Sequence, residues 1–172
     1  MEQILTELQT VFSEIPDAVY QRAADKINRH PRVFLYGAGR SGLMLRALAM
    51  RLAQMGRTVY YVGETITPAL AEGDLLILAS ASDTTRSVCE YAQSAKKLGA
   101  DLLILTASTD SVLTQISPAD VFFRTSTKDS STNSRQVMGS LFEQSLLLFG
   151  DRLVLELRHD AADMRKLHAN LE

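Results

Sequence analysis

Cysteine is nearly absent from this chain and tryptophan is absent altogether: the 172 residues include one cysteine, Cys89. A single thiol cannot form an internal disulfide, and it cannot supply a redox pair or a cysteine-based zinc site. Apolar runs of membrane-spanning length are also missing, and residues 1–12 carry acidic side chains where a secretion signal needs basic ones. We therefore expect a protein of the reducing cytoplasm that has no membrane as a partner.

An excess of charge of either sign is absent too. Eighteen Lys and Arg residues stand against 20 Asp and Glu residues, which gives a formal net charge of -2. A chain balanced in this way has no broad positive field with which to bind nucleic acid, so we expect no nucleic-acid partner and only local anion binding. The length and the 46% hydrophobic content fit a single globular domain over residues 1–172.

The spacing of apolar residues divides the chain into helical and extended segments. Residues 1–30 repeat an apolar residue every three or four positions, which predicts a helical lead-in with Pro16 separating two helices. Beyond it, short apolar runs alternate with helical patterns. The predicted strands are 32–36, 58–62, 74–79, 101–107 and 120–124, and the predicted helices that follow the lead-in are 41–55, 86–98, 112–116, 140–157 and 161–171.

Two of the predicted strands, which read LLILAS and LLILTA, are apolar on both faces. Such strands are typical of a parallel sheet that is covered on both sides by its crossover helices. We therefore predict an α/β protein with a three-layer αβα architecture and a five-stranded parallel sheet in the flavodoxin-like order 2-1-3-4-5. Residues 158–172 are expected to form a helical tail outside these layers.

The predicted helix over residues 140–157 is apolar nearly all round, with the sequence SLFEQSLLLFGDRLVLEL. One face of a lone domain covers only part of such a surface. We therefore expect this helix to pack in the subunit interface of a homo-oligomer, either a dimer or a tetramer.

A glycine-rich turn follows the first predicted strand. Gly37, Gly39 and Gly42 give the G-x-G-x-x-G spacing that lets a phosphate approach the backbone at the start of a helix. Glu64, at the end of the second strand, completes the fingerprint of a dinucleotide-binding site, so an NAD-binding domain is one alternative. A tight strand-to-helix turn without any ligand is another.

A second polar loop, SASDTTRS, follows the third predicted strand and precedes a helix. In the predicted strand order the first and third strands are neighbours whose connections leave in opposite directions, so the two loops should meet in one crevice. Hydroxyl groups and helix-end amides would then surround a phosphate, although Ser82 or Thr84 could instead cap the helix. The candidate substrate and phosphate ligands are Gly39, Arg40, Ser41, Arg46, Thr67, Ser80, Ser82, Thr84 and Thr85.

Several ordered segments are similar to one known family. They are GAGRSG (37–42), RALAMRLAQMG (46–56), VYYVGETITPAL (59–70), QVMGSLFEQSLLLFGD (136–151) and HANLE (168–172). With the Ser/Thr loop, they make the chain resemble the sugar isomerase (SIS) domain proteins, specifically the 6-phospho-3-hexuloisomerase family. The resemblance implies the SIS fold, interconversion of 3-hexulose 6-phosphate and fructose 6-phosphate, and homotetramers built from dimers. Where the family reads S-G-S-G-E-T, this chain has Ala81 and Asp83 in place of the two glycines.

Moving a carbonyl from C3 to C2 requires one base and an enediol, so the reaction needs neither a metal nor a cofactor. The resemblance implies that Glu143 is this base. The same residue also completes an S-x-x-E capping box with Ser140, in which it would bind a backbone amide and do no chemistry. His168 could protonate the sugar oxygen, either in its own subunit or in a neighbouring one.

Three functions remain open at this point. The first is a cofactor-independent isomerase of a hexulose phosphate, with Glu143 and His168 as its catalytic residues. The second is a non-catalytic SIS module that binds a sugar phosphate. The third is an NAD-binding domain with Glu64 on the ribose.

Overall fold

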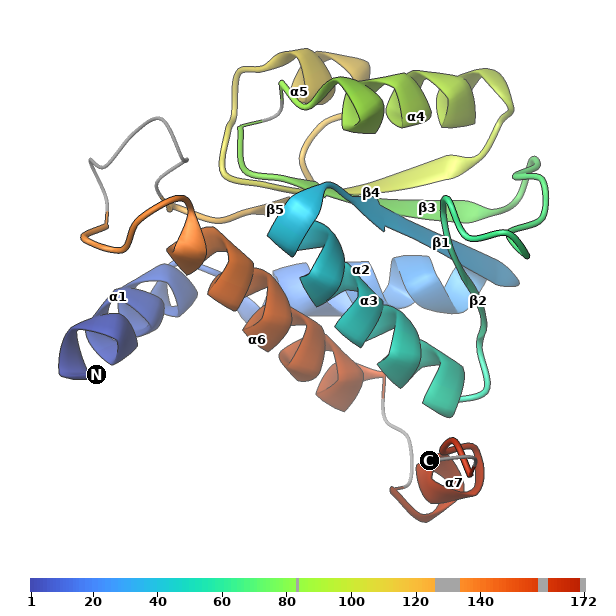
Figure 1. The fold of residues 1–172 in the computed structure, drawn as a ribbon, viewed down its shortest axis with the longest axis horizontal. Coiled ribbons are helices and arrows are strands. Elements are labelled where there is room, and N and C mark those ends of the chain that lie inside the picture. The colour runs from blue at the N-terminus through green and yellow to red at the C-terminus, as the bar shows by residue number, and fades with distance from the viewer. Residues whose placement is uncertain (83, 126–133, 158–160, 171–172) are drawn as a thin grey trace.

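The computed structural model describes residues 1–82, 84–125, 134–157 and 161–170. In these residues the chain forms a five-stranded parallel sheet in the order β2-β1-β3-β4-β5, which confirms the predicted topology (Figure 1). The strands are β1 (Arg32–Gly37), β2 (Thr58–Tyr61), β3 (Leu75–Ser80), β4 (Asp101–Thr106) and β5 (Val121–Phe122). The helices are α1 (Glu2–Ser13), α2 (Asp17–Arg29), α3 (Gly39–Gln54), α4 (Arg86–Lys97), α5 (Val112–Ile116), α6 (Ser140–Glu156) and α7 (Ala161–Lys166).

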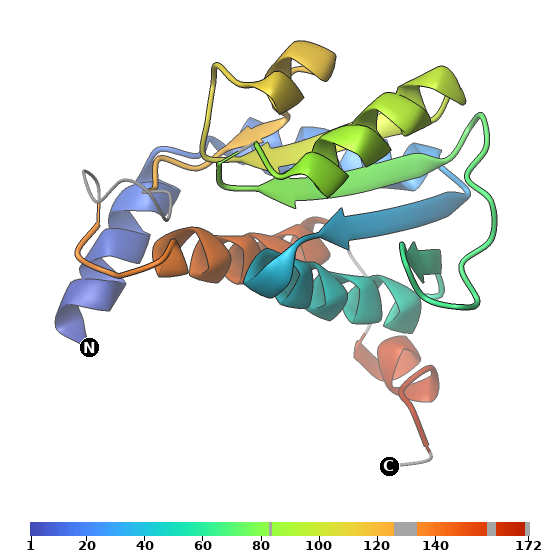
Figure 2. The ribbon, with the colours of Figure 1, turned by 45° about the horizontal axis from the view of Figure 1, so that its top comes forward.

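Alternate residues of the central strands face opposite sides of the sheet. Val33 and Leu35 of β1 join the buried cluster shared with α1, α2, α3 and α6, whereas Phe34 joins the cluster shared with α4 and α5. Figure 2 shows the resulting layers, with α4 and α5 on one side of the sheet and α3 and α6 on the other. Because both faces of β3 and β4 are covered, residues 75–79 and 102–105 are apolar and buried, as the sequence predicts.

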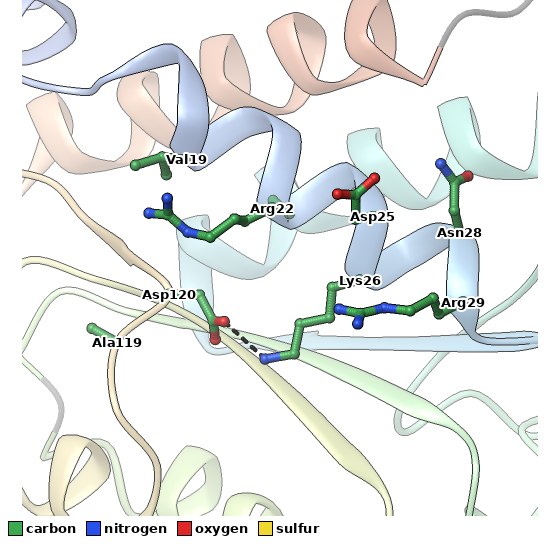
Figure 3. Close-up of a pocket in the computed structure, with 9 residues that line it drawn as sticks. Val19, Arg22, Asp25, Lys26, Asn28, Arg29, Ala119 and Asp120 are labelled. Atoms are coloured by element: carbon green, nitrogen blue, oxygen red, sulfur yellow. Dashed lines mark hydrogen bonds and ion pairs between the residues drawn. The ribbon is translucent and has the colours of Figure 1, made fainter.

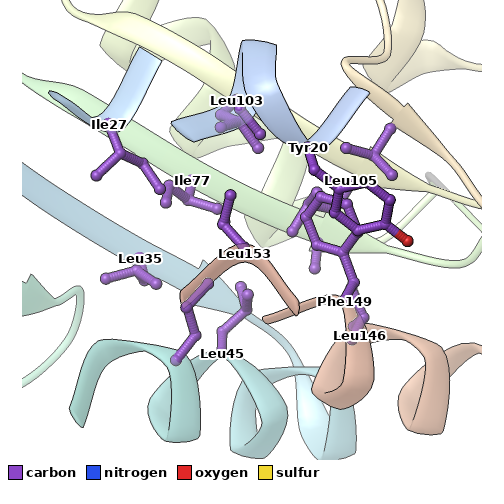
Figure 4. Packing of buried hydrophobic residues seen from close by; sticks show 14 of the residues in the cluster. Tyr20, Ile27, Leu35, Leu45, Ile77, Leu103, Leu105, Leu146, Phe149 and Leu153 are labelled. Atoms are coloured by element: carbon purple, nitrogen blue, oxygen red, sulfur yellow. The ribbon is translucent and has the colours of Figure 1, made fainter. Parts of the chain in front are cut away.

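The larger cluster fixes α6 against the sheet. Leu146, Phe149 and Leu153 of α6 point into it beside Leu45 of α3, and the ring of Tyr20 stacks on Phe149 at 5.0 Å between centroids (Figure 4). Each such side chain contributes about 1.5–3 kcal/mol on burial. The packing of α6 therefore sets where its first turn, with Glu143, lies relative to the sheet.

Both ends of the chain carry the predicted helices. Pro16 separates α1 from α2, as expected for a residue that lacks the amide proton a helix interior needs. The C-terminal helix α7 ends at Lys166 rather than continuing to residue 171, and none of its residues is buried. Of its residues only Met164 packs, partly buried, against the core cluster, so the helix gains little from extension. None of the helices in the described ranges combines the length and apolar character needed to cross a membrane.

Candidate functional site

A pocket of about 340 Å³ lies at the carboxyl ends of β1 and β3, where the chain leaves the two neighbouring strands toward opposite faces of the sheet. The glycine turn and the Ser/Thr loop both line it, and the first turn of α6 forms its third side. The described lining residues are Ala38, Gly39, Arg40, Ser41, Ala79, Ser80, Ala81, Ser82, Thr85, Met138, Gly139, Phe142 and Glu143.

The glycine turn is required by the backbone. Gly39 has φ +57°, a left-handed conformation that glycine adopts without penalty, and a Cβ there would meet no atom within 4 Å. Gly42 lies where α3 crosses the end of β1: a Cβ there would lie 2.2 Å from the carbonyl oxygen of Gly37 and 2.5 Å from the hydroxyl of Tyr61. These glycines therefore bring the start of α3 close to the strand, and residues 38–41 line the pocket.

The Ser/Thr loop supplies hydroxyl groups from the other side of the pocket. Ser80 Oγ and Thr85 Oγ1 are 3.5 Å apart, and both residues line the pocket together with Ser82. Thr84 donates to Ser82 Oγ at 3.2 Å but does not itself line this pocket. The alternative that Ser82 or Thr84 caps α4 is wrong, because the N-cap residue is Thr85 and it makes no side-chain capping bond. Asp83 lies outside the described residues.

Three helices of more than ten residues begin at this pocket. The N-caps of α3, α4 and α6 are Ala38, Thr85 and Gly139, and all three line it. The amide end of each helix carries a partial positive charge, and its first N–H groups have no partner within the helix. A phosphate or another compact anion is the ligand that such an arrangement binds best.

Glu143 is the one carboxylate among the described lining residues, and only 8% of the residue is exposed. Arg40 Nε donates to Glu143 Oε2 at 2.5 Å, so the pocket holds a buried carboxylate beside a guanidinium. The predicted capping box is therefore wrong. Gly139, with φ +80°, is the N-cap, and Ser140 is the first helical residue, with its Oγ donating to the carbonyl of Val137 at 2.8 Å.

Besides Thr84, two of the predicted ligands, Arg46 and Thr67, do not line the pocket. Arg46 forms an ion pair with Glu64 and lies over the ring of Tyr61, with its guanidinium carbon 3.7 Å from the centroid. Thr67 donates to the carbonyl oxygen of Tyr61 at 2.7 Å, which holds the turn after β2. Glu64, which the dinucleotide alternative needs on a ribose, is held by Arg46.

Tyr61 is a residue that the sequence analysis missed. Its hydroxyl donates to the carbonyl of Gly37 at 2.8 Å and accepts from the Gly37 amide at 3.3 Å. Tyr61 therefore fixes the backbone at the start of the glycine turn. Burial raises the pKa of Tyr61, which keeps the hydroxyl protonated and able to donate. No local pattern marks this residue, because its role arises from the pairing of β2 with β1.

His168 lies at the far end of α3 from the pocket of its own chain. The neighbouring Leu167 approaches Gly56, where a Cβ would lie 3.6 Å from Leu167 Cδ1. At 1.5 Å per residue, the 16 residues of α3 separate that end from the glycine turn by about 24 Å. His168 is exposed, and its Nδ1 lies 3.0 Å from the carbonyl oxygen of Ala169.

The start of α6 contributes pocket residues that the sequence analysis did not single out. Met138 and Gly139 line the pocket with left-handed backbone, at φ +59° and +80°. A methionine in this conformation costs about 1–2 kcal/mol, so the surrounding structure must impose it. The sequence shows the Met-Gly dipeptide, but no sequence pattern predicts a left-handed backbone at a methionine.

A second hollow lies between α2 and the start of β5 (Figure 3). Lys26 crosses it to Asp120 at 2.8 Å, and the other oxygen of Asp120 accepts the amide of Ile104 at 2.9 Å. Its lining carries charges of both signs, and the half-buried pair of Lys26 with Asp120 joins α2 to the edge of the sheet. We therefore assign this hollow a structural role.

The fold and the pocket define a class: a three-layer α/β protein with a pocket at the switch point of its parallel sheet, where three helices begin and a buried carboxylate lies. The SIS domain model matches residues 26–148, and the chain belongs to the SIS domain family. This match confirms the resemblance found in the sequence.

Individual relatives extend the comparison. The chain is 42% identical to a 3-hexulose-6-phosphate isomerase of Bacillus subtilis over 99% of this chain and 96% of that protein. It is 43% identical to a 3-hexulose-6-phosphate isomerase of Mycobacterium gastri over 87% of this chain and 78% of that protein. A crystal structure of a hypothetical protein from Methanococcus jannaschii, for which a 3-hexulose-6-phosphate isomerase function was inferred, has a TM-score of 0.83 and 28% identity, covering 99% of this chain and 98% of that one.

Proposed function

We propose that this chain is a sugar-phosphate isomerase that interconverts 3-hexulose 6-phosphate and fructose 6-phosphate in the pocket beside Glu143. The observation that carries the proposal is a single buried carboxylate in a pocket at which three helices begin. The names of the relatives from Bacillus subtilis and Mycobacterium gastri support the choice of substrate. We also propose the cytoplasm as its location, in keeping with a single, buried cysteine.

The phosphate group of the substrate binds between the glycine turn and the Ser/Thr loop in this proposal. The amides of Gly39 and Ser41 lie at the start of α3, and the hydroxyls of Ser80, Ser82 and Thr85 lie opposite them. Bonds from such groups to a charged phosphate oxygen are about twice as strong as neutral ones. Phosphate held here leaves the sugar carbons free to extend toward α6.

Glu143 then transfers the proton between C2 and C3. Its carboxylate removes the proton from C2 of the 3-hexulose, the electron pair forms the C2–C3 double bond, and the C3 oxygen takes up a proton to give a cis-enediol. Return of the proton to C3 and loss of the proton on the C2 oxygen give fructose 6-phosphate. One base on one face of the enediol serves both steps, and a positioned base of this kind contributes about 10²–10⁴-fold to the rate.

Arg40 supports this step from beside the base. Its guanidinium uses Nε to reach Glu143 and carries further N–H donors, while Arg40 itself lines the pocket. We propose that these donors stabilise the negative charge that develops on the sugar oxygen as the proton leaves carbon. The ion pair also keeps the carboxylate in one position before the substrate arrives.

We propose that the chain forms a homo-oligomer through the outer face of α6. Leu147, Leu148 and Leu155 of this helix are exposed, the last at 70%, and Leu43 and Met50 are exposed on the neighbouring helix α3. An apolar surface of this kind is typical of an interface between subunits. In a dimer or tetramer, His168 of one chain could then reach the pocket of another, which it does not do in its own.

A thermal-shift panel with fructose 6-phosphate, other sugar phosphates, inorganic phosphate and NADH tests the proposal. Because a ligand of the native state stabilises it, fructose 6-phosphate at about 100 times its Kd should raise the melting temperature by about 5–10 °C. Each stabilising sugar is then assayed for turnover. Stabilisation by NADH alone would support the dinucleotide alternative, and sugar binding without turnover would support the non-catalytic SIS module.

A further inference from the structure

The carboxylate of Glu7, on α1, holds the segment that leads into the pocket. Ser134 Oγ donates to Glu7 Oε2 at 2.6 Å, the amide of Arg135 donates to Oε1 at 3.1 Å, and Gln136 Nε2 donates to Oε2 at 3.1 Å. Ser134 Oγ also accepts the amide of Gln136 at 2.9 Å, so the segment is folded around the carboxylate. We call Glu7 with residues 134–136 the α1 clamp.

The clamp lies immediately before the strained part of the pocket wall. Only Val137 separates it from Met138 and Gly139, the two left-handed residues that line the pocket. On the far side, the amide and the hydroxyl of Ser140 both donate to the carbonyl of Val137, at 3.1 and 2.8 Å. The unfavourable backbone at Met138 is thus held from both ends, as a strained residue must be.

Glu143 follows this segment by one helical turn and takes its position from the same start of α6. Its amide donates to the carbonyl of Gly139 at 3.2 Å, so a displacement of Gly139 displaces the first turn that carries Glu143. Since a misplacement of about 1 Å can cost a hundredfold in rate, the geometry of this turn matters for proton transfer.

On the basis of the proposed function, we propose that Glu7 is a positioning residue of the isomerase site: through the α1 clamp, it fixes the Met138–Gly139 wall and hence the carboxylate of Glu143. The charge is essential to this role. Four donors converge on Glu7, three from residues 134–136 and one from Nε2 of Gln3. An ionised carboxylate accepts all of them, whereas a glutamine would turn its own N–H donors toward them. These hydrogen bonds, that from Ser134 above all, lower the pKa of Glu7 to about 2, so the acceptor remains ionised at neutral pH.

Hydrogen exchange tests whether the clamp holds the segment. In Glu7→Gln we expect the amides of residues 134–139 to exchange about tenfold faster than in the wild type. Glu2→Gln is the matched control, because it removes the same charge from an exposed position of the same helix. Unchanged exchange in Glu7→Gln would overturn the proposal. Ser134→Ala removes a donor and leaves the carboxylate in place, and it replaces Glu7→Gln in this test if that variant does not fold.

Kinetics test whether the clamp acts on catalysis. We expect kcat of Glu7→Gln to fall about tenfold or more. The proposed phosphate ligands lie on the glycine turn and the Ser/Thr loop, outside the clamp. The Kd of fructose 6-phosphate, measured by thermal shift, should therefore stay within twofold of the wild-type value. Ser134→Ala should lower kcat in the same way, and the double variant should be no slower than Glu7→Gln alone.

The two proposals fail in different ways. Faster exchange with unchanged kcat would overturn the positioning role and leave the proposed function intact. A wild type that binds but does not turn over any sugar phosphate would refute the proposed function, whereas the exchange experiment on the clamp does not depend on turnover.

Discussion

Replacement of Glu143 by glutamine separates the chemical role of this residue from its structural one. The substitution keeps the size of the side chain and removes its ability to accept a proton. An ion pair with a largely exposed partner contributes at most about 1 kcal/mol, and the Arg40 side chain is 66% exposed. For a domain of this length, such a loss lowers the melting temperature by about 2–4 °C. The variant should therefore fold and bind fructose 6-phosphate.

Its turnover should fall by about 10²–10⁴-fold, because that is the contribution of a positioned general base. The measurement is the rate of fructose 6-phosphate formation from 3-hexulose 6-phosphate, with the thermal shift on the same preparation as the test of folding and binding. Glu90→Gln is a suitable control, since it makes the same change of carboxylate to amide in an exposed ion pair, with Arg86, outside the pocket lining. Retention of more than about a tenth of wild-type kcat in Glu143→Gln would refute its role as the base.

Three further predictions concern the turn, the interface and the acid stability of the clamp. Gly42→Ala should lower the free energy of unfolding by about 1–3 kcal/mol in urea denaturation, because its Cβ would lie 2.2 Å from the Gly37 carbonyl oxygen; an unchanged midpoint would contradict this packing. Leu155→Glu should shift the chain toward a smaller species in light scattering, since 70% of Leu155 is exposed on the proposed interface; an unaltered mass would exclude Leu155 from it. Glu7 has its pKa lowered from 4.5 to about 2, chiefly by the hydrogen bond from Ser134, so its stabilising contribution is present above about pH 4.5 and is lost as the pH falls toward 2. The stability difference between wild type and Glu7→Gln should therefore shrink over that range, and a constant difference would contradict the assignment.

The order of the sheet could be predicted because it follows from patterns that the chain carries locally. Doubly apolar strands indicate a sheet covered on both faces, and the helices between them indicate parallel crossovers. The meeting of the glycine turn with the Ser/Thr loop then follows from the strand order alone. Residues such as Gly39, Ser41 and Ser80 are therefore found in the pocket without any knowledge of side-chain packing.

Predictions that depended on side-chain packing did not place residues correctly in the pocket of this chain. Arg46 lies one turn beyond the glycine turn, but the ring of Tyr61 and the carboxylate of Glu64 hold it away from the pocket lining. The C-terminal tail has few apolar residues, so its position depends on contacts with other elements. In the structure, His168 lies beside the end of α3 that is far from the pocket. Sequence spacing says which residues are near in the chain, whereas these positions depend on neighbours from other elements.

Glu143 shows most clearly why the local pattern was insufficient. The residues from Ser140 to Glu143 fit a capping box, and in a helix that began one residue later they would form one. The helix begins instead after Gly139, whose left-handed backbone makes Ser140 the first helical residue and leaves Glu143 to pair with Arg40. That backbone belongs to a segment anchored by Ser134 on Glu7, 127 residues earlier in the chain. Whether the carboxylate caps a helix or faces a substrate thus depends on a long-range contact that no pattern around residue 143 encodes.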